Sequence, residues 1–314
     1  MNLDHWESYY RGGSLVSCPT NPEPYYTGEV RKAWAEFFAE LPDGARVLDM
    51  GTGNGAVALI ARETAQENER YFEIHGVDLA RIDPLKYVPG AEAMLAGIQF
   101  HPGVSTEALP FDSDYFSAVG GQYILEYTDT DKSISEAYRV LKPGCACQFI
   151  LHHADSIVVR NAMESLRQAD FALSEVKVLR KFHTYCERAR KSPSRAISAR
   201  NNLYHAGALL QKAASQSTNP VLLKFLVDSI SGLLANRGRL TEGQMLQETL
   251  RFERELRNWL LRLKDLASAA PAEERVKDIL AAARRMGFDE TSAQLQMQDG
   301  EILVGWRVAL RKPS

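Results

Sequence analysis

A carboxylate followed by alternating glycines is the part of this sequence best suited to chemistry. Residues 45–55 read Ala-Arg-Val-Leu-Asp-Met-Gly-Thr-Gly-Asn-Gly, an apolar run that stops at Asp49 and continues into spaced glycines. Glycine permits positive φ and lets a ligand lie against bare backbone, and a helix N-terminus offers unpaired N–H groups. We therefore predict a strand over 46–50, a tight turn over 51–55 and a helix over 56–64. Together these elements would form a nucleotide-type ligand site.

The charge of Asp49 decides which ligand fits this turn. The spacing Gly51-x-Gly53-x-x-Ala56 formally satisfies the dinucleotide fingerprint. A carboxylate two residues before the first glycine would nevertheless repel a pyrophosphate, by several kcal/mol at an effective dielectric of about 20. The same carboxylate suits a ligand that carries an ammonium and a sulfonium. A Walker loop is excluded because no Gly-Lys-Ser/Thr follows. The expected cofactor is S-adenosylmethionine.

Four later segments repeat a family pattern in order along the chain. They are Phe-Glu-Ile-His-Gly-Val-Asp-Leu-Ala at 72–80, Leu-Pro-Phe-Asp-Ser-Asp-Tyr-Phe-Ser-Ala-Val at 109–119, Ala-Tyr-Arg-Val-Leu-Lys-Pro-Gly at 137–144, and Gly287-Phe288 with the apolar run 302–310. With the glycine turn, these segments resemble the class I (Rossmann-like) S-adenosylmethionine-dependent methyltransferases. The resemblance covers residues 40–160 closely and 271–312 loosely, and it says little about the segment between them.

The resemblance and the residue pattern agree on an α/β fold. Strand and helix signals alternate until about residue 151, which is typical of a doubly wound sheet, and the family implies a mostly parallel seven-stranded one. From 177 to 270 the apolar positions lie three or four apart, which predicts a helical insertion between the fifth strand (148–151) and the last helix. The predicted division is an N-terminal cap or substrate segment (1–40), the cofactor-binding core (41–176), the helical insertion as lid or dimer surface (177–270), and the C-terminal helix with closing strands (271–314).

The predicted insertion is basic, whereas the rest of the chain is acidic. Residues 180–265 hold 16 Lys or Arg and 7 Asp or Glu, which leaves 21 basic and 33 acidic residues elsewhere and a net charge of −3 overall. Solvated helix faces, an acidic small substrate or partner, and nucleic acid would each explain this asymmetry. The bases interleave with aliphatic residues and not with stacking aromatics, which argues against binding of single-stranded nucleic acid.

The resemblance assigns cofactor contacts to individual residues. Asp78 ends the predicted second strand, where the family holds the ribose hydroxyls, and Leu79 would pack on the adenine or ribose. Ser105 stands where the family has an acid that contacts the adenine amino group, so a neutral hydroxyl replaces a charged contact. The predicted cofactor residues are Asp49, Gly51, Gly53, Asp78, Leu79, Ser105, Thr106 and Gln122.

Two histidines and two tyrosines are the candidates for the acceptor side. His152 and His153 close the predicted fifth strand, and since successive strand side chains point oppositely, at most one faces the site. We choose His153 as a general base and His152 as a substrate-side residue. Tyr25 and Tyr26 belong to an aromatic N-terminal segment that would shape a substrate pocket. Ordinary packing remains the alternative for all four, and no metal-ligand set is visible in the sequence.

The function that these features favour is methylation of a small molecule, with O-methylation preferred on general grounds. The alternatives are an RNA methyltransferase that docks through the basic insertion, and a non-catalytic methyltransferase-like module. The N-terminus lacks a basic and apolar signal pattern, no run approaches about 20 apolar residues, and the four cysteines form no Cys-x-x-Cys pair. We therefore expect a cytoplasmic protein without membrane or nucleic-acid partners, with a homodimer through the insertion as one arrangement.

Overall fold

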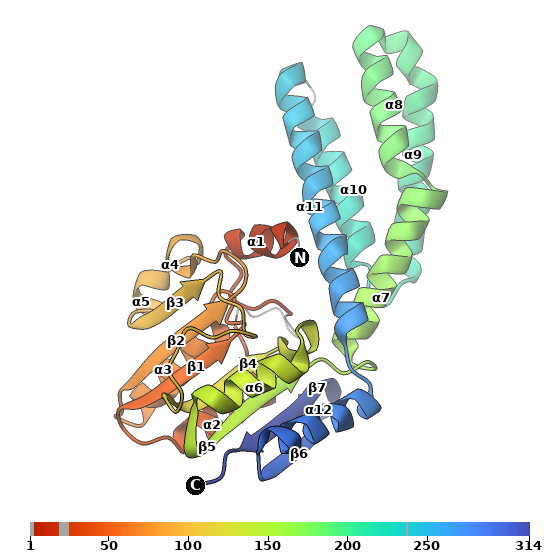
Figure 1. Ribbon diagram of the computed structural model, residues 1–314. Helices are drawn as coiled ribbons and strands as arrows, with labels where there is room; N and C mark the ends of the chain where they lie inside the picture. Colours follow the sequence, from red (N-terminus) through yellow and green to blue (C-terminus); the bar gives the residue numbers. More distant parts are fainter. Residues whose placement is uncertain (1–2, 19–24, 237) are drawn as a thin grey trace. The chain divides into compact units, whose positions relative to one another are not determined.

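The computed structural model describes residues 3–18, 25–236 and 238–314. One seven-stranded sheet has the order β3-β2-β1-β4-β5-β7-β6 (Figure 1). All pairs are parallel except those of β7, which runs antiparallel to β5 and β6. The mostly parallel seven-stranded sheet predicted from the sequence is therefore confirmed. The strands are β1 (Ala45–Met50), β2 (Phe72–Asp78), β3 (Ile98–Pro102), β4 (Phe116–Gln122), β5 (Leu141–Leu151), β6 (Glu290–Gln298) and β7 (Ile302–Arg311).

Helices pack on both faces of this sheet. On one face, α6 (Thr130–Val140) and α12 (Glu273–Met286) share an apolar core with Phe149 and Leu151 of β5. The opposite face carries α2 (Gly28–Ala39), and there the side chain of Gln148 donates to the Ala33 carbonyl at 3.0 Å. The other helices of this part are α1 (Asp4–Arg11), α3 (Ala56–Glu67), α4 (Pro84–Tyr87) and α5 (Ala91–Met94).

Gly120 in β4 allows α2 to lie close to the sheet. A Cβ on Gly120 would lie 2.8 Å from the Trp34 ring, so a larger residue would push α2 away. Trp34 is fully buried and donates through Nε1 to Gln122 at 2.6 Å. The packing of one helix therefore fixes a side chain at the carboxyl end of β4, where parallel sheets bind ligands.

Strand β5 begins earlier than the sequence predicts. The expected strand covered 148–151, with Lys-Pro-Gly as a turn before it, whereas β5 spans Leu141–Leu151. Leu141 pairs with Phe116, and the next pair of the register is Ala146 with Ala118. Four residues of β5 therefore lie opposite one residue of β4, and Gly144 within them has φ +73°. The predicted turn exists as a bulge inside the strand, because the chain resumes pairing beyond it.

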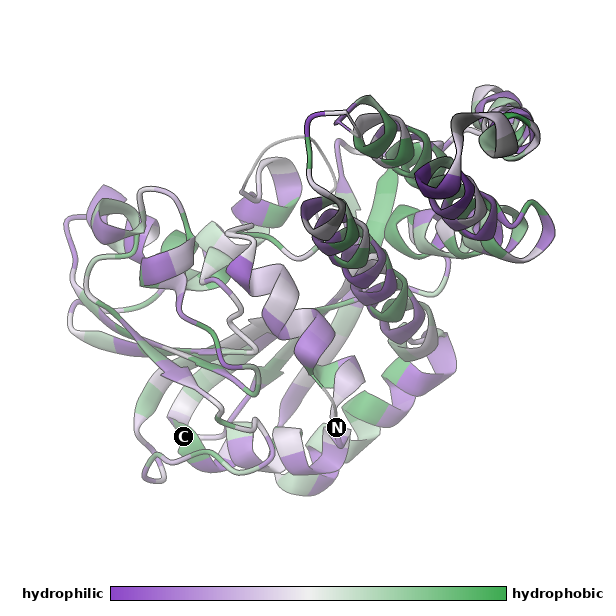
Figure 2. Ribbon diagram, turned by 90° about the horizontal axis from the view of Figure 1, so that it is seen from above, coloured by the Kyte–Doolittle hydropathy of each residue, from purple (hydrophilic) through white to green (hydrophobic). Residues whose placement is uncertain are grey.

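A second compact unit, Arg160–Lys264, is helical. Its apolar core includes Phe182, Leu210, Leu226 and Phe252. Figure 2 shows both apolar and polar stretches along its long helices. The sequence placed the helical insertion at 177–270, whereas this unit begins at Arg160 and ends at Lys264. Across the described residues, no helix is long and apolar enough to cross a membrane. The helices are α7 (Ile157–Asp170), α8 (Val178–Lys191), α9 (Pro193–Gln216), α10 (Val221–Asn236) and α11 (Glu242–Ala269).

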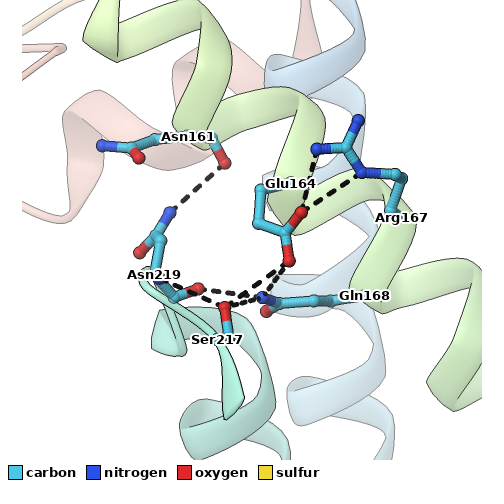
Figure 3. Close-up of polar contacts among 6 residues, drawn as sticks. All are labelled: Asn161, Glu164, Arg167, Gln168, Ser217 and Asn219. Atoms are coloured by element: carbon cyan, nitrogen blue, oxygen red, sulfur yellow. Dashed lines mark hydrogen bonds and ion pairs between the residues drawn. The ribbon is translucent and has the colours of Figure 1, made fainter. Parts of the chain in front are cut away.

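A polar cluster links α7 to the turn between α9 and α10 (Figure 3). The Gln168 side-chain nitrogen lies 2.9 Å from the Ser217 hydroxyl, 2.9 Å from the Asn219 carbonyl and 3.0 Å from Glu164 Oε1. Asn219 in turn donates to the Asn161 carbonyl at 3.3 Å. Gln168 is 6 % exposed, so this amide ties together backbone and side-chain groups that water reaches poorly.

Candidate functional site

The glycine turn between β1 and α3 has the backbone that the sequence predicts. Gly51, Gly53 and Gly55 have φ values of +67°, +53° and +92°. A Cβ on Gly51 would lie 2.5 Å from the side chain of Ile124, and one on Gly53 would lie 2.7 Å from the Tyr10 ring. Both the positive φ and the close neighbours therefore require glycine at these two positions. The backbone of the turn is therefore closely packed against Ile124 and Tyr10.

Asp49 holds this turn to the helix that follows it. Its Oδ2 accepts hydrogen bonds from the Thr52 hydroxyl at 2.7 Å and from the Ala58 N–H at 3.2 Å. Its Oδ1 has no partner among the described residues. Burial raises the pKa of Asp49 to about 7, against the effect of the two hydrogen bonds and with a small contribution from the charge of Asp78. Ionised Asp49 is thus a costly buried charge that a cation would stabilise.

Asp78 connects the end of β2 to the same turn. Its Oδ2 accepts from the Gly53 N–H at 2.9 Å, and its Oδ1 accepts from the Ala80 N–H at 2.8 Å. Burial raises the pKa of Asp78 to about 6, and these two backbone hydrogen bonds act in the opposite direction. Each carboxylate oxygen has two lone pairs, so Asp78 can still accept hydrogen bonds from a ligand.

Two neighbouring cavities lie at the carboxyl ends of the parallel strands. The larger has a volume of about 590 Å³, and the smaller, of about 20 Å³, shares Gly51, Gln122 and Tyr10 with it. The predicted cofactor residues divide between them. The larger cavity is lined by Gly51, Asp78, Leu79, Ser105, Thr106 and Gln122, and the smaller one also by Asp49 and Gly53. Each of the eight residues therefore lines at least one of these two adjoining cavities, at one edge of the sheet.

The predicted adenine end combines one exposed side chain with two hydroxyls. Leu79 is 47 % exposed although it is apolar, which suits a residue that a flat ligand covers. The Thr106 hydroxyl lies 3.0 Å from the Ser133 hydroxyl, and the Ser105 hydroxyl accepts from the Glu107 N–H at 3.2 Å. Both hydroxyls can make a further hydrogen bond.

Of the two histidines, His152 lies on the larger cavity, as expected of a substrate-side residue, and His153 does not. His152 is fully buried and lines the larger cavity. His153 instead stacks on Trp306 with a centroid distance of 4.8 Å, and its Nδ1 accepts from the Asp155 N–H at 2.9 Å. The prediction that His153 lies at the site was therefore wrong. Alternation along β5 explains it, because His152 continues the face of Gln148 and His153 the opposite face.

The ring of His152 is fixed and uncharged. It lies parallel to the Tyr123 ring, with a centroid distance of 3.9 Å and an interplanar angle of 5°. Its backbone N–H donates to Glu126 Oε1 at 2.7 Å, and its Nε2 lies 3.9 Å from the sulfur of Cys18. Burial lowers the pKa of His152 to about 3. The imidazole is therefore neutral near pH 7 and a weak base.

The two tyrosines predicted for the acceptor side do not line the larger cavity. Tyr25 is 48 % exposed and lies on neither cavity, whereas Tyr26 is buried and lines the smaller one. The N-terminal wall comes instead from α1, whose Trp6 and Tyr10 line the larger cavity. The side chain of Asn54 donates to the Tyr10 carbonyl at 3.0 Å and anchors α1 to the glycine turn.

The far wall contains residues that no motif marked. Asp265 accepts from His5 at 2.6 Å and from the Trp6 indole at 3.1 Å. Arg275, near the start of α12, also lines the larger cavity. These side chains come together through contacts across more than 250 residues of sequence, which local patterns do not encode. Glu126, in the turn just after β4, is buried and also lies on the wall of this cavity.

Comparison with known proteins is consistent with this geometry. A family model described as "Methyltransferase domain" matches residues 24–190, more than half of the chain. The ubiquinone/menaquinone biosynthesis C-methyltransferases UbiE of Xanthomonas campestris and Vibrio vulnificus are 29 % and 30 % identical over 119 and 126 residues. These alignments cover 37 % and 38 % of this chain and 46 % of each relative, so the chain spans about half the length of the curated relatives it matches.

Solved structures in the same class are more distant. A SAM-dependent methyltransferase from Aquifex aeolicus aligns with a TM-score of 0.38 and 17 % identity, covering 48 % of this chain and 74 % of that one. The match to the family model is what decides membership. This chain belongs to the class I methyltransferase domain family, in which S-adenosylmethionine is the methyl donor.

Proposed function

We propose that this protein transfers the methyl group of S-adenosylmethionine to a small molecule bound in the larger cavity. The observation that carries the proposal is the shared wall of the two cavities. The glycine turn with Asp49 and Asp78 lies on one side, and a wall of rings and polar side chains that includes Trp6, Tyr127 and His152 lies on the other. A donor and an acceptor held together in the larger cavity would react largely because they are aligned and shielded from water.

The donor would lie across the turn with its charges toward the acids. The ribose hydroxyls would donate to Asp78, whose oxygens already fix the turn through Gly53. The adenine would lie between Leu79 and the hydroxyls of Ser105 and Thr106. The ammonium of the methionyl group would face Asp49, whose Oδ1 has no partner among the described residues. A cation there would offset the desolvation of this carboxylate.

The acceptor is proposed to be small and to react through oxygen. The cavity volume of about 590 Å³ lies in the range of small-molecule sites, and it must also admit the donor. The cavity wall away from the turn offers a carboxylate, Glu126, in a position suited to a nucleophile that loses a proton on methylation, such as a hydroxyl. This support favours O-methylation over transfer to an atom that carries no proton.

The RNA alternative has weaker support from the helical unit. Several of its bases pair with acids one helical turn away: Arg167 with Glu164 at 2.9 Å, and Lys191 with Glu187 at 3.2 Å. Arg251 pairs similarly with Glu255 at 2.9 Å. Part of the positive charge is thus used within the helices themselves, as expected of solvated helix faces.

Donor binding and its charge dependence test the proposal. Isothermal titration calorimetry should show S-adenosylmethionine and S-adenosylhomocysteine binding to the full chain. Asp78→Asn should weaken both by at least about tenfold through loss of a charge-assisted acceptor. The matched control is Asp131→Asn, which changes a 62 % exposed carboxylate on α6 and should bind like the wild type.

Two outcomes would contradict the proposal. One is no heat of binding at saturating S-adenosylmethionine, which would favour a non-catalytic module. The other is methyl incorporation from labelled donor into added structured RNA at low salt but into no small molecule, which would favour the RNA alternative.

A further inference from the structure

Buried polar atoms without partners gather on one wall of the larger cavity. Among the residues the structure describes, Glu126 Oε2, Tyr127 Oη and His152 Nδ1 are buried and make no hydrogen bond. All three residues line the larger cavity. Glu126 and Tyr127 belong to the short 3₁₀ turn Leu125–Tyr127 after β4, and His152 follows β5, its parallel neighbour. The topology therefore places three open hydrogen-bonding positions side by side at the carboxyl edge of the sheet.

Such a group of unpaired atoms indicates a ligand. Native proteins pair nearly all buried polar atoms, and the exceptions concentrate where function needs them. Here the three atoms differ in chemistry: a carboxylate oxygen, a phenol hydroxyl and an imidazole nitrogen. Together they can receive a hydroxyl proton and hold a neighbouring polar group. Methylation of a hydroxyl requires that one of them accept its proton.

Glu126 is the group suited to accepting that proton. The His152 N–H holds its other oxygen at 2.7 Å, so the carboxylate is fixed in place. The titratable or charged side chains around it are Tyr123, Tyr127, His152 and Arg275. Burial raises the pKa of Glu126 to about 7, and backbone hydrogen bonds and the charge of Arg275 act in the opposite direction. A carboxyl group whose pKa lies close to the working pH is an effective general base.

We propose that Glu126 contacts the methyl acceptor and takes the proton from its hydroxyl, while Tyr127 and His152 bind the same molecule. This inference rests on the proposed function. The acceptor class is a neutral molecule with a hydroxyl on a planar aromatic ring. Trp6 lies edge-on to Tyr127 with a centroid distance of 6.0 Å and stacks with Tyr10 at 6.2 Å, so rings form the wall against which such a molecule would pack.

The proposed step balances in atoms and charge. The acceptor oxygen forms a bond to the methyl carbon, the bond between that carbon and sulfur breaks, and its electron pair stays on sulfur. The hydroxyl proton moves to Glu126 Oε2. A sulfonium and a carboxylate become a thioether and a carboxylic acid, so two opposite charges disappear together. A cavity of low dielectric favours that change over one that creates a new charge.

The experiment uses 2-naphthol as the hydroxyl-bearing probe, since it stays protonated near pH 7 and its near-ultraviolet absorbance reports whether the hydroxyl has lost its proton. Wild-type protein loaded with S-adenosylhomocysteine should bind the probe, by calorimetry and by the absorbance change. Glu126→Gln keeps the shape of the side chain and an oxygen for the His152 N–H. We expect it to weaken probe binding by about tenfold or more. Tyr127→Phe removes one hydroxyl only and should weaken binding by about threefold.

Methyl transfer provides the second readout. With S-adenosylmethionine as donor, Glu126→Gln should lower transfer to 2-naphthol by about a hundredfold or more. It should also remove the rise in rate with pH that the wild type shows through about pH 7. Glu301→Gln is the matched control, because Glu301 is an exposed residue in the turn before β7 and should change neither readout.

The outcomes separate this inference from the function on which it rests. Normal donor binding with no probe binding, or with equal probe binding in the wild type and Glu126→Gln, would overturn the assignment of Glu126 and leave the donor site intact. Absence of donor binding in the wild type would instead overturn the proposed function. If Glu126→Gln is unfolded by circular dichroism, Tyr127→Phe decides the question, and unchanged probe affinity in that variant would count against the subsite.

Discussion

The substitution Asp49→Asn should stabilise the donor-free protein while it weakens donor binding. Both hydrogen bonds to the Asp49 side chain, from Thr52 and from the Ala58 N–H, end on the same oxygen. An asparagine whose oxygen takes that place keeps both, and its amide occupies the position of Oδ1, which has no partner among the described residues. The substitution therefore removes a buried charge and leaves the local pairing in place.

The size and sign of the effect follow from the pKa of Asp49. The native value is about 7 and the ordinary value is 3.8, so the folded state holds the proton to higher pH than the unfolded state. Unfolding between these values releases a proton, and the free energy of unfolding falls as pH rises from about 4 to 7. About three pKa units correspond to roughly 4 kcal/mol as an upper limit. Asparagine does not titrate, so this fall in the free energy of unfolding with pH is absent from the variant.

Urea unfolding at about pH 4 and about pH 8 measures this difference. Relative to the wild type, Asp49→Asn should gain up to about 4 kcal/mol between the two pH values. A constant offset of about 1–3 kcal/mol, from the unpaired amide, does not affect that gain. The variant should also bind S-adenosylmethionine at least about tenfold more weakly, because an amide does not attract the ammonium.

Two results would refute this reasoning. One is a stability difference that does not change with pH, which would mean that Asp49 is not the buried charge we infer. The other is donor affinity equal to that of the wild type, which would mean that the carboxylate does not face a cation. Asp131→Asn, on the exposed surface, should show neither effect and serves as the control.

Three further substitutions test the turn, the ribose contact and the helical unit. Gly51→Ala places a Cβ 2.5 Å from Ile124 at φ +67° and should lower stability by about 1–3 kcal/mol in thermal unfolding. Asp78→Ala removes the acceptor of the Gly53 N–H as well as the ribose acceptor, so calorimetry should show at least about a hundredfold loss of donor affinity. Gln168→Leu leaves the Asn219 carbonyl without its 2.9 Å partner and should lower the stability of the helical unit by about 1–3 kcal/mol, read from amide hydrogen exchange in α7.

The donor side was predictable because its determinants are local. The strand that ends just after Asp49, the glycines at positions of positive φ and the start of the helix at Ala56 all lie within residues 45–56. The end of β2 at Asp78 is equally local, and parallel pairing of β1 with β2 brings the two acids to one edge of the sheet. Sequence order alone therefore placed the parts that would bind S-adenosylmethionine.

The choice between His152 and His153 needed tertiary information. Alternation states that the two rings point to opposite faces, but not which face carries the site. That depends on the neighbours: Phe149 and Leu151 share the core with α6 and α12, and His153 follows them to that face. The sequence therefore predicts that the two rings face opposite sides of the sheet, but only the packing of α6 and α12 shows which side each ring takes.

The proposed acceptor side combines residues that follow the helical unit with residues from the N-terminal helix α1. Asp265 and Arg275 enter the core unit directly after the helical unit ends at Lys264, and His5 and Trp6 meet Asp265 from the N-terminus. The donor turn uses none of these residues. Substitutions around Asp265 should therefore change which acceptor is methylated and leave donor affinity within about twofold, because the hydrogen bonds of Asp265 run to His5 and Trp6 and not to the donor turn. Loss of donor binding in Asp265→Asn, measured by calorimetry, would contradict this separation of the two halves of the site.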